Sequence, residues 1–148
     1  MEIIPGIGFS KLLFGASMAD AVDAFGHPEE TGLLDELEDS KSVVWHYWEN
    51  GFTLFFEAQH QQIFNCVEID NTGALLWGHR VFESNEKQII ELFKKKGILK
   101  YEKELHEWGE KRLSFDEAHI DFYFEKNKLN SINYCKPLHD SPILILPN

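Results

Sequence analysis

The chain has 148 residues, of which 43% are hydrophobic and 14% aromatic, and its formal net charge is −11. This length and composition fit one domain or two small fused units and exclude a disordered chain. Residues 1–70 contain 13 acidic residues and two lysines, whereas residues 71–148 contain 12 acidic and 12 basic residues, so the excess acidity lies in the first half. Nucleic acid is not an expected partner, because phosphates need Lys and Arg. A basic protein partner and a merely solvated surface both fit this charge.

The N-terminal residues and the apolar runs give no targeting signal. The segment from Met1 to Gly6 lacks a basic region and contains a proline, so no signal peptide is expected. No apolar run approaches the ~18 residues of a membrane span, and the predicted location is the cytoplasm. Cys66 and Cys135 lie in apolar, strand-like runs and are expected to be reduced core thiols, although one disulfide stays open because a sequence gives no distance between them.

The first predicted helix follows Ser17. Ser17 and Asp20 have the spacing of a capping box, and apolar residues at helical spacing continue to Phe25. Gly26 and Pro28 then end the helix.

The rest of the first half is predicted to form strands. Residues 29–40 are too acidic to indicate a strand, and an exposed loop or short helix is expected there. Strands are predicted at 43–48, 52–57 and 63–69. Asn50-Gly51 predicts a tight hairpin turn with positive φ, which glycine tolerates.

The second half has the same order of elements. A helix is predicted from Ser84 to the terminating Gly97, with three lysines near its C-terminus. Residues 99–105 are interpreted as an extra strand, followed by strands at 111–115, 119–125 and 129–135. Polar and apolar residues alternate along 119–125, which predicts one buried and one solvated face.

The two halves can be overlaid with an offset of 68 positions. Val22 then matches Ile90, Phe25 matches Phe93, and residues 54–57 match 122–125. We therefore predict an α+β fold of two tandem helix-plus-antiparallel-sheet repeats, with the helices packed on one face of the sheet. The expected units are residues 1–70 and 71–148. Only a short turn separates them, which favours a shared sheet in one continuous globule.

The residues from Leu13 to Pro28 resemble a recurrent bacterial pattern. In this pattern a Gly and a Ser or Thr open a helix, a Val follows, and Gly-x-Pro ends it, as Gly15, Ser17, Val22 and Gly26-His27-Pro28 do here. It occurs in the SmpA/OmlA family of outer-membrane assembly lipoproteins and in the tandem αβ units of proteins like the β-lactamase inhibitor protein. The resemblance implies helices that cover a sheet, and protein binding. The chain lacks the lipidated cysteine of the assembly family, so that role is not implied.

No catalytic residue, cofactor or metal site is predicted. Gly15 and Ser17 loosely resemble a nucleophile elbow, but its last position is Ala19, and helix capping accounts for the serine. The seven histidines form no metal-binding signature. His119 and Asp121 would share the solvated face of one strand, with His46 beside them in a shared sheet. A metal or acid–base site and a solvated strand face are both compatible with this arrangement.

The aromatic residues outnumber what one face of a small sheet needs. Trp45 and Tyr47 are predicted to share a strand face, with Trp48 on the other. They form either interface anchors or a thick core.

The predicted function is that of a non-enzymatic protein-interaction module, of immunity or inhibitor type, that binds a basic partner. The alternative is a small-ligand-binding protein or a hydrolase with its site on the sheet face. A homodimer is compatible with either function. The predicted partner-binding residues are Asp35, Glu36, Glu38, Asp39, Trp45, Tyr47 and Trp48.

Overall fold

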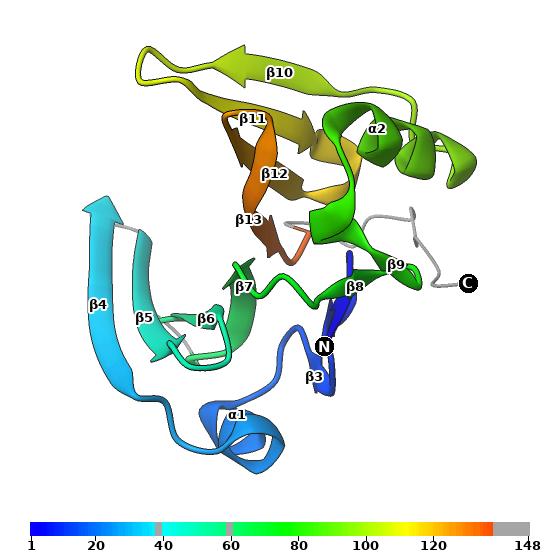
Figure 1. Ribbon diagram of the computed structural model, residues 1–148. Coiled ribbons are helices and arrows are strands. Elements are labelled where there is room, and N and C mark those ends of the chain that lie inside the picture. The colour runs from blue at the N-terminus through cyan, green and yellow to red at the C-terminus, as the bar shows by residue number, and fades with distance from the viewer. Residues whose placement is uncertain (38–39, 59–60, 138–148) are drawn as a thin grey trace.

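The computed structural model describes residues 1–37, 40–58 and 61–137, with the main chain alone at 35–37 and 40. Its largest element is an eight-stranded antiparallel sheet with the strand order β10-β11-β12-β13-β7-β6-β5-β4 (Figure 1). In chain order these strands are β4 (Glu30–Leu37), β5 (Ser40–Tyr47), β6 (Phe52–Glu57), β7 (Phe64–Ile69), β10 (Glu102–Leu105), β11 (Glu110–Phe115), β12 (Ile120–Glu125) and β13 (Lys128–Cys135).

A second, smaller sheet has five short strands in the order β3-β2-β1-β8-β9. They are β1 (Glu2–Ile4), β2 (Gly8–Phe9), β3 (Leu12–Leu13), β8 (Leu75–Leu76) and β9 (His79–Arg80). The parallel pairing of β1 with β8 joins the three N-terminal strands of this sheet to β8 and β9. Both halves of the chain therefore contribute strands to each sheet.

Two α-helices and two 3₁₀ turns complete the described fold. They are α1 (Met18–Phe25), η1 (Val81–Glu83), α2 (Glu86–Lys95) and η2 (Asp116–Ala118). The α+β class and the antiparallel sheet are confirmed, and strand is the dominant secondary structure. Neither α-helix of the described ranges has the length and apolar character needed to cross a membrane.

Both α-helices begin at capping boxes. The Ser17 hydroxyl accepts a hydrogen bond from the Asp20 amide at 3.1 Å, and the Asp20 carboxylate accepts one from the Ser17 amide at 3.1 Å. Asn85 and Gln88 form the same reciprocal pair before α2. The second helix is thus capped by Asn85, one residue beyond the predicted start.

The core lies between one face of the large sheet and the two helices and small sheet that cover it. Phe25 of α1 contacts Phe52 with 4.9 Å between ring centroids, and Phe93 of α2 stacks on Phe115 at 3.8 Å. Because side chains alternate along a strand, residues in register form rows on one face. One row on this face belongs to the core and consists of Trp45, Leu54, Val67, Tyr134, Ile120 and Phe115.

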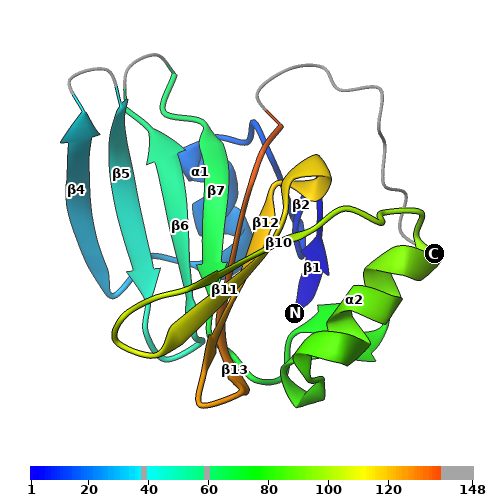
Figure 2. The ribbon, with the colours of Figure 1, turned by 90° about the horizontal axis from the view of Figure 1, so that it is seen from above.

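The large sheet is strongly bent. Figure 1 shows β4 and β10 at the two ends of an arc, with β7 and β13 at its middle and both helices on its outer side. In the view turned by 90°, β4–β7 stand apart from α2 (Figure 2). The face turned away from the helices, called the open face below, is therefore the inner face of the arc.

Several sequence-based expectations are wrong. Residues 30–37, expected to be a loop or short helix, form edge strand β4, whose hydrogen bonds come from β5. The extra strand is shorter than predicted and begins at Glu102. The short strands of the small sheet were not predicted. Gly51 does have a positive φ of 73°, as expected, in a four-residue connection between Tyr47 and Phe52.

The two cysteines form a disulfide bond. Cys66 of β7 and Cys135 of β13 are directly opposite each other in the register of the two central strands. The expectation of reduced core thiols is therefore wrong. The pairing depends on the register of two strands 69 residues apart in sequence, which local patterns do not encode.

Candidate functional site

A polar row crosses all eight strands on the open face of the large sheet. Each strand contributes one side chain, and each residue is in register with the next. The row, from β4 to β10, consists of Glu30, His46, Thr53, Glu68, Asn133, Asp121, Ser114 and Glu102.

The polar row is acidic. Four of its eight residues are carboxylates, one is a histidine, and none is lysine or arginine. A neighbouring cation on this face, Arg112, is engaged by Glu104 at 2.6 Å. Charges close together in a concave site reinforce one another's potential, so this face attracts cations.

One end of the polar row carries an aromatic stack. His46 Nδ1 lies 3.0 Å from Thr53 Oγ1, and its ring stacks on Trp48 with 4.1 Å between centroids and 9° between planes. The Trp48 indole donates a hydrogen bond to Glu30 Oε1 at 3.0 Å. Trp48 is nevertheless 58% exposed, so an ordered indole faces solvent beside a carboxylate.

A pocket of about 610 Å³ lies on the first-half side of the open face, beside the centre of the sheet. Val44, Phe55 and Leu34 give it an apolar lining, and His46 and Glu68 of the polar row reach it as well. Burial and the charge of Asp70 raise the pKa of Glu68, an effect that His46 partly offsets. The remaining lining residues are Gly32, Leu33, Ser42, Cys66, Asn133 and Cys135.

The three predicted aromatic anchors are divided between the two faces, as the alternation predicts. Tyr47 is 1% exposed and its hydroxyl donates a hydrogen bond to the Gly26 carbonyl at 2.8 Å. Trp45 packs against Phe56 on the core side. Of the three, only Trp48 lies on the open face. Tyr47 is buried and therefore has no surface that a partner could contact.

The four predicted acidic residues cannot be placed in the site. Glu38 and Asp39 lie outside the described residues, as do the side chains of Asp35 and Glu36. The main chain at 35 and 36 belongs to β4, at the edge of the sheet.

The structure does not bring His119, Asp121 and His46 together. His119 precedes β12 and has a left-handed φ of 52°, so it is not part of the alternating strand. Asp121 does face the open side, but β13, β7 and β6 separate it from His46. Within residues 1–37, 40–58 and 61–137, no group of three or more His, Cys, Asp or Glu could hold a metal ion.

Sequence reasoning missed most of the polar row, including its central residues Glu68 and Asn133. Each sits in a strand with alternating polar and apolar residues, which identifies its face. Their adjacency depends on the β7–β13 register, and sequence patterns do not predict that register.

A second pocket, of about 740 Å³, lies between α2 and the strands β10 and β11. At its edge the Glu86 carboxylate binds Lys103 at 2.6 Å and Lys111 at 3.1 Å. These ion pairs tie the helix to both strands. Because both lysines already pair with a carboxylate of the same chain, the pocket offers a ligand less positive charge than its lining residues suggest.

Comparison of the chain with protein-family models, with curated proteins and with solved structures gives no match in any of the three. The geometry of the open face is therefore the basis for a functional proposal.

Proposed function

We propose that the chain is a non-enzymatic protein-interaction module that binds a basic protein across the open face of its large sheet. The observation that supports this proposal is the polar row, with four carboxylates and no lysine or arginine over eight strands. A basic segment laid along it would meet the carboxylates of four strands, β4, β7, β12 and β10, and charged hydrogen bonds are the stronger kind. An immunity or inhibitor-type role, sequestering a basic toxin or enzyme, is the specific form of the proposal.

The same face supplies apolar contacts beside its charges. Trp48 is exposed and held in place by His46 and Glu30, and tryptophan is favoured among residues that dominate binding energy. Phe55 and Val44 line the neighbouring pocket. An apolar side chain of the partner would enter this pocket while its basic residues contact the row.

Neutralising the row tests the proposal. The variant carries Glu68→Gln, Asp121→Asn and Glu102→Gln, and the matched control carries Asp23→Asn, Glu91→Gln and Glu107→Gln, at exposed positions away from the row. A partner is first isolated from extract of the source cells on immobilised parent protein and then purified. We expect the row variant to associate roughly ten times more slowly at low salt, because steering depends on these charges.

The salt dependence separates steering from general charge. The association rate of the parent and of the control should fall as salt rises, and that of the row variant should fall less. Equal rates for the row variant and the control would refute the open face as the binding surface.

A second candidate function is small-ligand binding in the pocket on the open face. The convergence of His46 and Glu68 on an apolar pocket of about 610 Å³ favours it, because ligand sites are typically apolar with a few polar groups. A hydrolase there would need a nucleophile or activated water that no described contact identifies. Thermal-shift screening of small amines and cationic aromatics on the parent and on Glu68→Gln tests this candidate, and a shift that Glu68→Gln abolishes would support it.

We also propose that the chain consists of two copies of one helix-plus-antiparallel-sheet unit, residues 1–70 and 71–148. The N-caps Ser17 and Asn85 are 68 positions apart, the offset of the sequence overlay. The register of β6 with β7 shifts at Phe55/Phe56, and that of β12 with β13 shifts at Tyr123/Phe124, again 68 positions on. These coincidences support duplication and the resemblance to SmpA/OmlA-like and β-lactamase-inhibitor-protein-like units.

The disulfide bears on the predicted location. Disulfide bonds persist mainly in oxidising compartments, so the Cys66–Cys135 bond counts against the cytoplasm. The homodimer also stays a prediction, which the mass of the purified protein in solution would test.

A further inference from the structure

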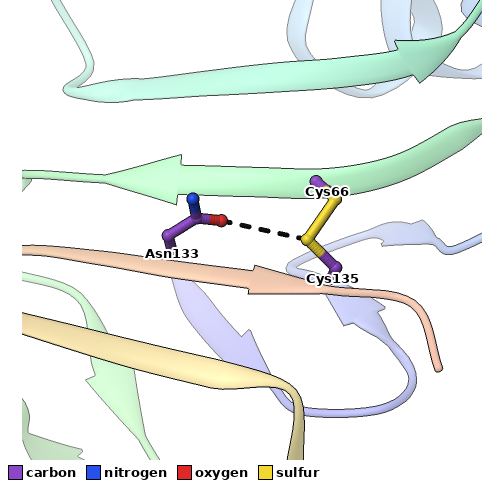
Figure 3. The surroundings of a disulfide bond; sticks show 3 residues. All are labelled: Cys66, Asn133 and Cys135. Atoms are coloured by element: carbon purple, nitrogen blue, oxygen red, sulfur yellow. Dashed lines mark hydrogen bonds between the residues drawn. A yellow bond between two sulfur atoms is a disulfide. The ribbon is translucent and has the colours of Figure 1, made fainter. Parts of the chain in front are cut away.

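The Cys66–Cys135 disulfide lies on the open face rather than in the core. It joins β7 to β13, the pair of strands through which the two halves of the large sheet meet. Figure 3 shows the bond bridging these two strands with the Asn133 side chain beside it. Both cysteines are only half-buried, and both line the pocket of about 610 Å³. A small molecule in this pocket would therefore meet the sulfur atoms directly.

The surroundings of the two sulfur atoms differ. The Asn133 side-chain oxygen lies 4.0 Å from Cys135 Sγ, two residues away on the same strand face. If the disulfide opened, the Asn133 oxygen could accept a hydrogen bond from the Cys135 thiol. With the side-chain amide turned over, its NH₂ group would instead donate a hydrogen bond to the Cys135 thiolate. No described hydrogen bond offers Cys66 the same help. With its amide turned, Asn133 makes Cys135 the better leaving group.

The pocket also selects by charge. The Glu68 carboxylate is part of its lining, and Glu30 and Asp121 belong to the same polar row. A cationic molecule is attracted to this face and an anionic one is repelled.

We propose that the disulfide is a site of reversible modification by a small cationic thiol. The thiolate of that molecule attacks Cys66 Sγ, a new S–S bond forms, and the Cys66–Cys135 bond breaks. Its electron pair goes to Cys135 Sγ as a thiolate, which Asn133 stabilises after its amide has turned to present its N–H groups. When Cys135 attacks the mixed disulfide in turn, the original bond is restored and the small thiolate departs.

Opening the bond does not require unfolding. Cys66 and Cys135 occupy the last of four paired positions between β7 and β13, and three further pairs, ending at Ile69 and Ile132, continue without them. The row and the rest of the pocket therefore stay assembled while the sulfur atoms react. This reactivity is independent of the proposed binding of a basic protein, because it needs no partner.

The test exposes the native protein, without denaturant, to cysteamine or to 3-mercaptopropionate, which are similar in size and opposite in charge. Samples are quenched with iodoacetamide and mapped by mass spectrometry, with rates divided by the thiolate fraction of each reagent. We expect cysteamine on Cys66 and the alkyl group on Cys135. Cysteamine should react about three to ten times faster at low salt, and this preference should shrink as salt is raised.

Two variants and a reference sharpen the result. Glu68→Gln should reduce the preference for cysteamine, and Asn133→Ala should spread the added thiol over both cysteines; Ser131→Ala, on the same strand, is the control for both. Glutathione disulfide serves as the reference for intrinsic reactivity. Any one of three results would overturn the proposal. These are a reaction that proceeds only at the rate of global unfolding, equal labelling of both cysteines in the parent, and a rate that does not depend on the charge of the reagent.

Discussion

The hydroxyl of Tyr134 in β13 donates a hydrogen bond to the carbonyl of Gly8 in β2, at 2.7 Å and 126 residues apart in sequence. The same oxygen accepts a hydrogen bond from the amide of Ile4 at 3.3 Å. One buried phenol therefore connects the large sheet to the small one. Burial raises its pKa, and the hydrogen bond from Ile4 lowers it by less.

Replacing this hydroxyl should destabilise the protein. Tyr134→Phe leaves the carbonyl of Gly8 and the amide of Ile4 without this partner, and we expect a loss of about 1–3 kcal/mol in the free energy of unfolding. Urea unfolding at neutral pH measures it. Tyr101→Phe, at a 42% exposed tyrosine, is the control and should change stability by less than about 0.5 kcal/mol. An equal effect of both substitutions would contradict the role of Tyr134.

A side chain at Gly51 should be costly for two reasons. Its φ is 73°, and an added Cβ would lie 2.9 Å from Asp70 Oδ1 and 3.0 Å from the main-chain nitrogen of Asn71. We expect Gly51→Ala to cost about 1–3 kcal/mol. Gly109 has a φ of 92° with nothing within 4 Å of an added Cβ, so Gly109→Ala measures the backbone cost alone. If Gly51→Ala and Gly109→Ala lower the denaturant midpoint equally, the contacts of the added Cβ with Asp70 and Asn71 do not contribute to the cost.

The ion pairs of Glu86 should make stability depend on acidity. Burial alone would raise the pKa of Glu86, but the hydrogen bonds and charges of Lys103 and Lys111 outweigh it, and the pKa lies below its ordinary value of 4.5. A carboxylate with a lowered pKa stabilises the fold above its unfolded pKa, and this stability is lost as the pH falls through the folded value.

Glu86→Gln should therefore cost about 1–2 kcal/mol at pH 7, and the difference from the parent should shrink below pH 4.5. Urea unfolding at a series of pH values checks this. Glu91→Gln, on an exposed position of the same helix, is the control. A difference that stays constant with pH would show that the lysines do not act on this carboxylate.

The acidic segment and the open face give different expectations for binding. Neutralising Asp35, Glu36, Glu38 and Asp39 together should slow association with a basic partner if the segment steers it, with little change in folding. If the polar row alone makes the contact, this variant should keep most of the parent's association rate, while the row variant loses about tenfold. Stopped-flow measurements on both variants at two salt concentrations distinguish these outcomes, and parental rates for both would mean that the acidity only confers solubility.

The parts of the fold that sequence predicted are those with local causes. Ser17 and Asp20 lie three residues apart, so their capping box is visible in the sequence. The turn at Gly51 is likewise indicated by the glycine itself, without any distant contact. The acidic strand β4 was missed because its hydrogen bonds come from β5 and its composition suits an edge. The two-residue strands of the small sheet are too short to show a pattern.

For the candidate site, alternation correctly placed Trp48, the residue after β5, on the face opposite that of Tyr47. It did not indicate that Tyr47 would be covered by Phe25 of α1, because which face a helix covers is a tertiary property. The adjacency of Glu68 to Asn133, and of Cys66 to Cys135, follows from one register between strands far apart in the chain. That register is set by global packing, which no window of sequence contains.

The disulfide also determines how the molecule would carry a mechanical load. Cys66 and Cys135 close a covalent ring that contains β8, β9, α2 and β10–β12. A force applied at the two chain ends passes through the sulfur atoms and bypasses the ring. Stretching the oxidised protein would therefore extend only the chain outside the ring, and cutting the S–S bond would release roughly 230 Å of hidden chain, at ~3.3–3.6 Å per residue.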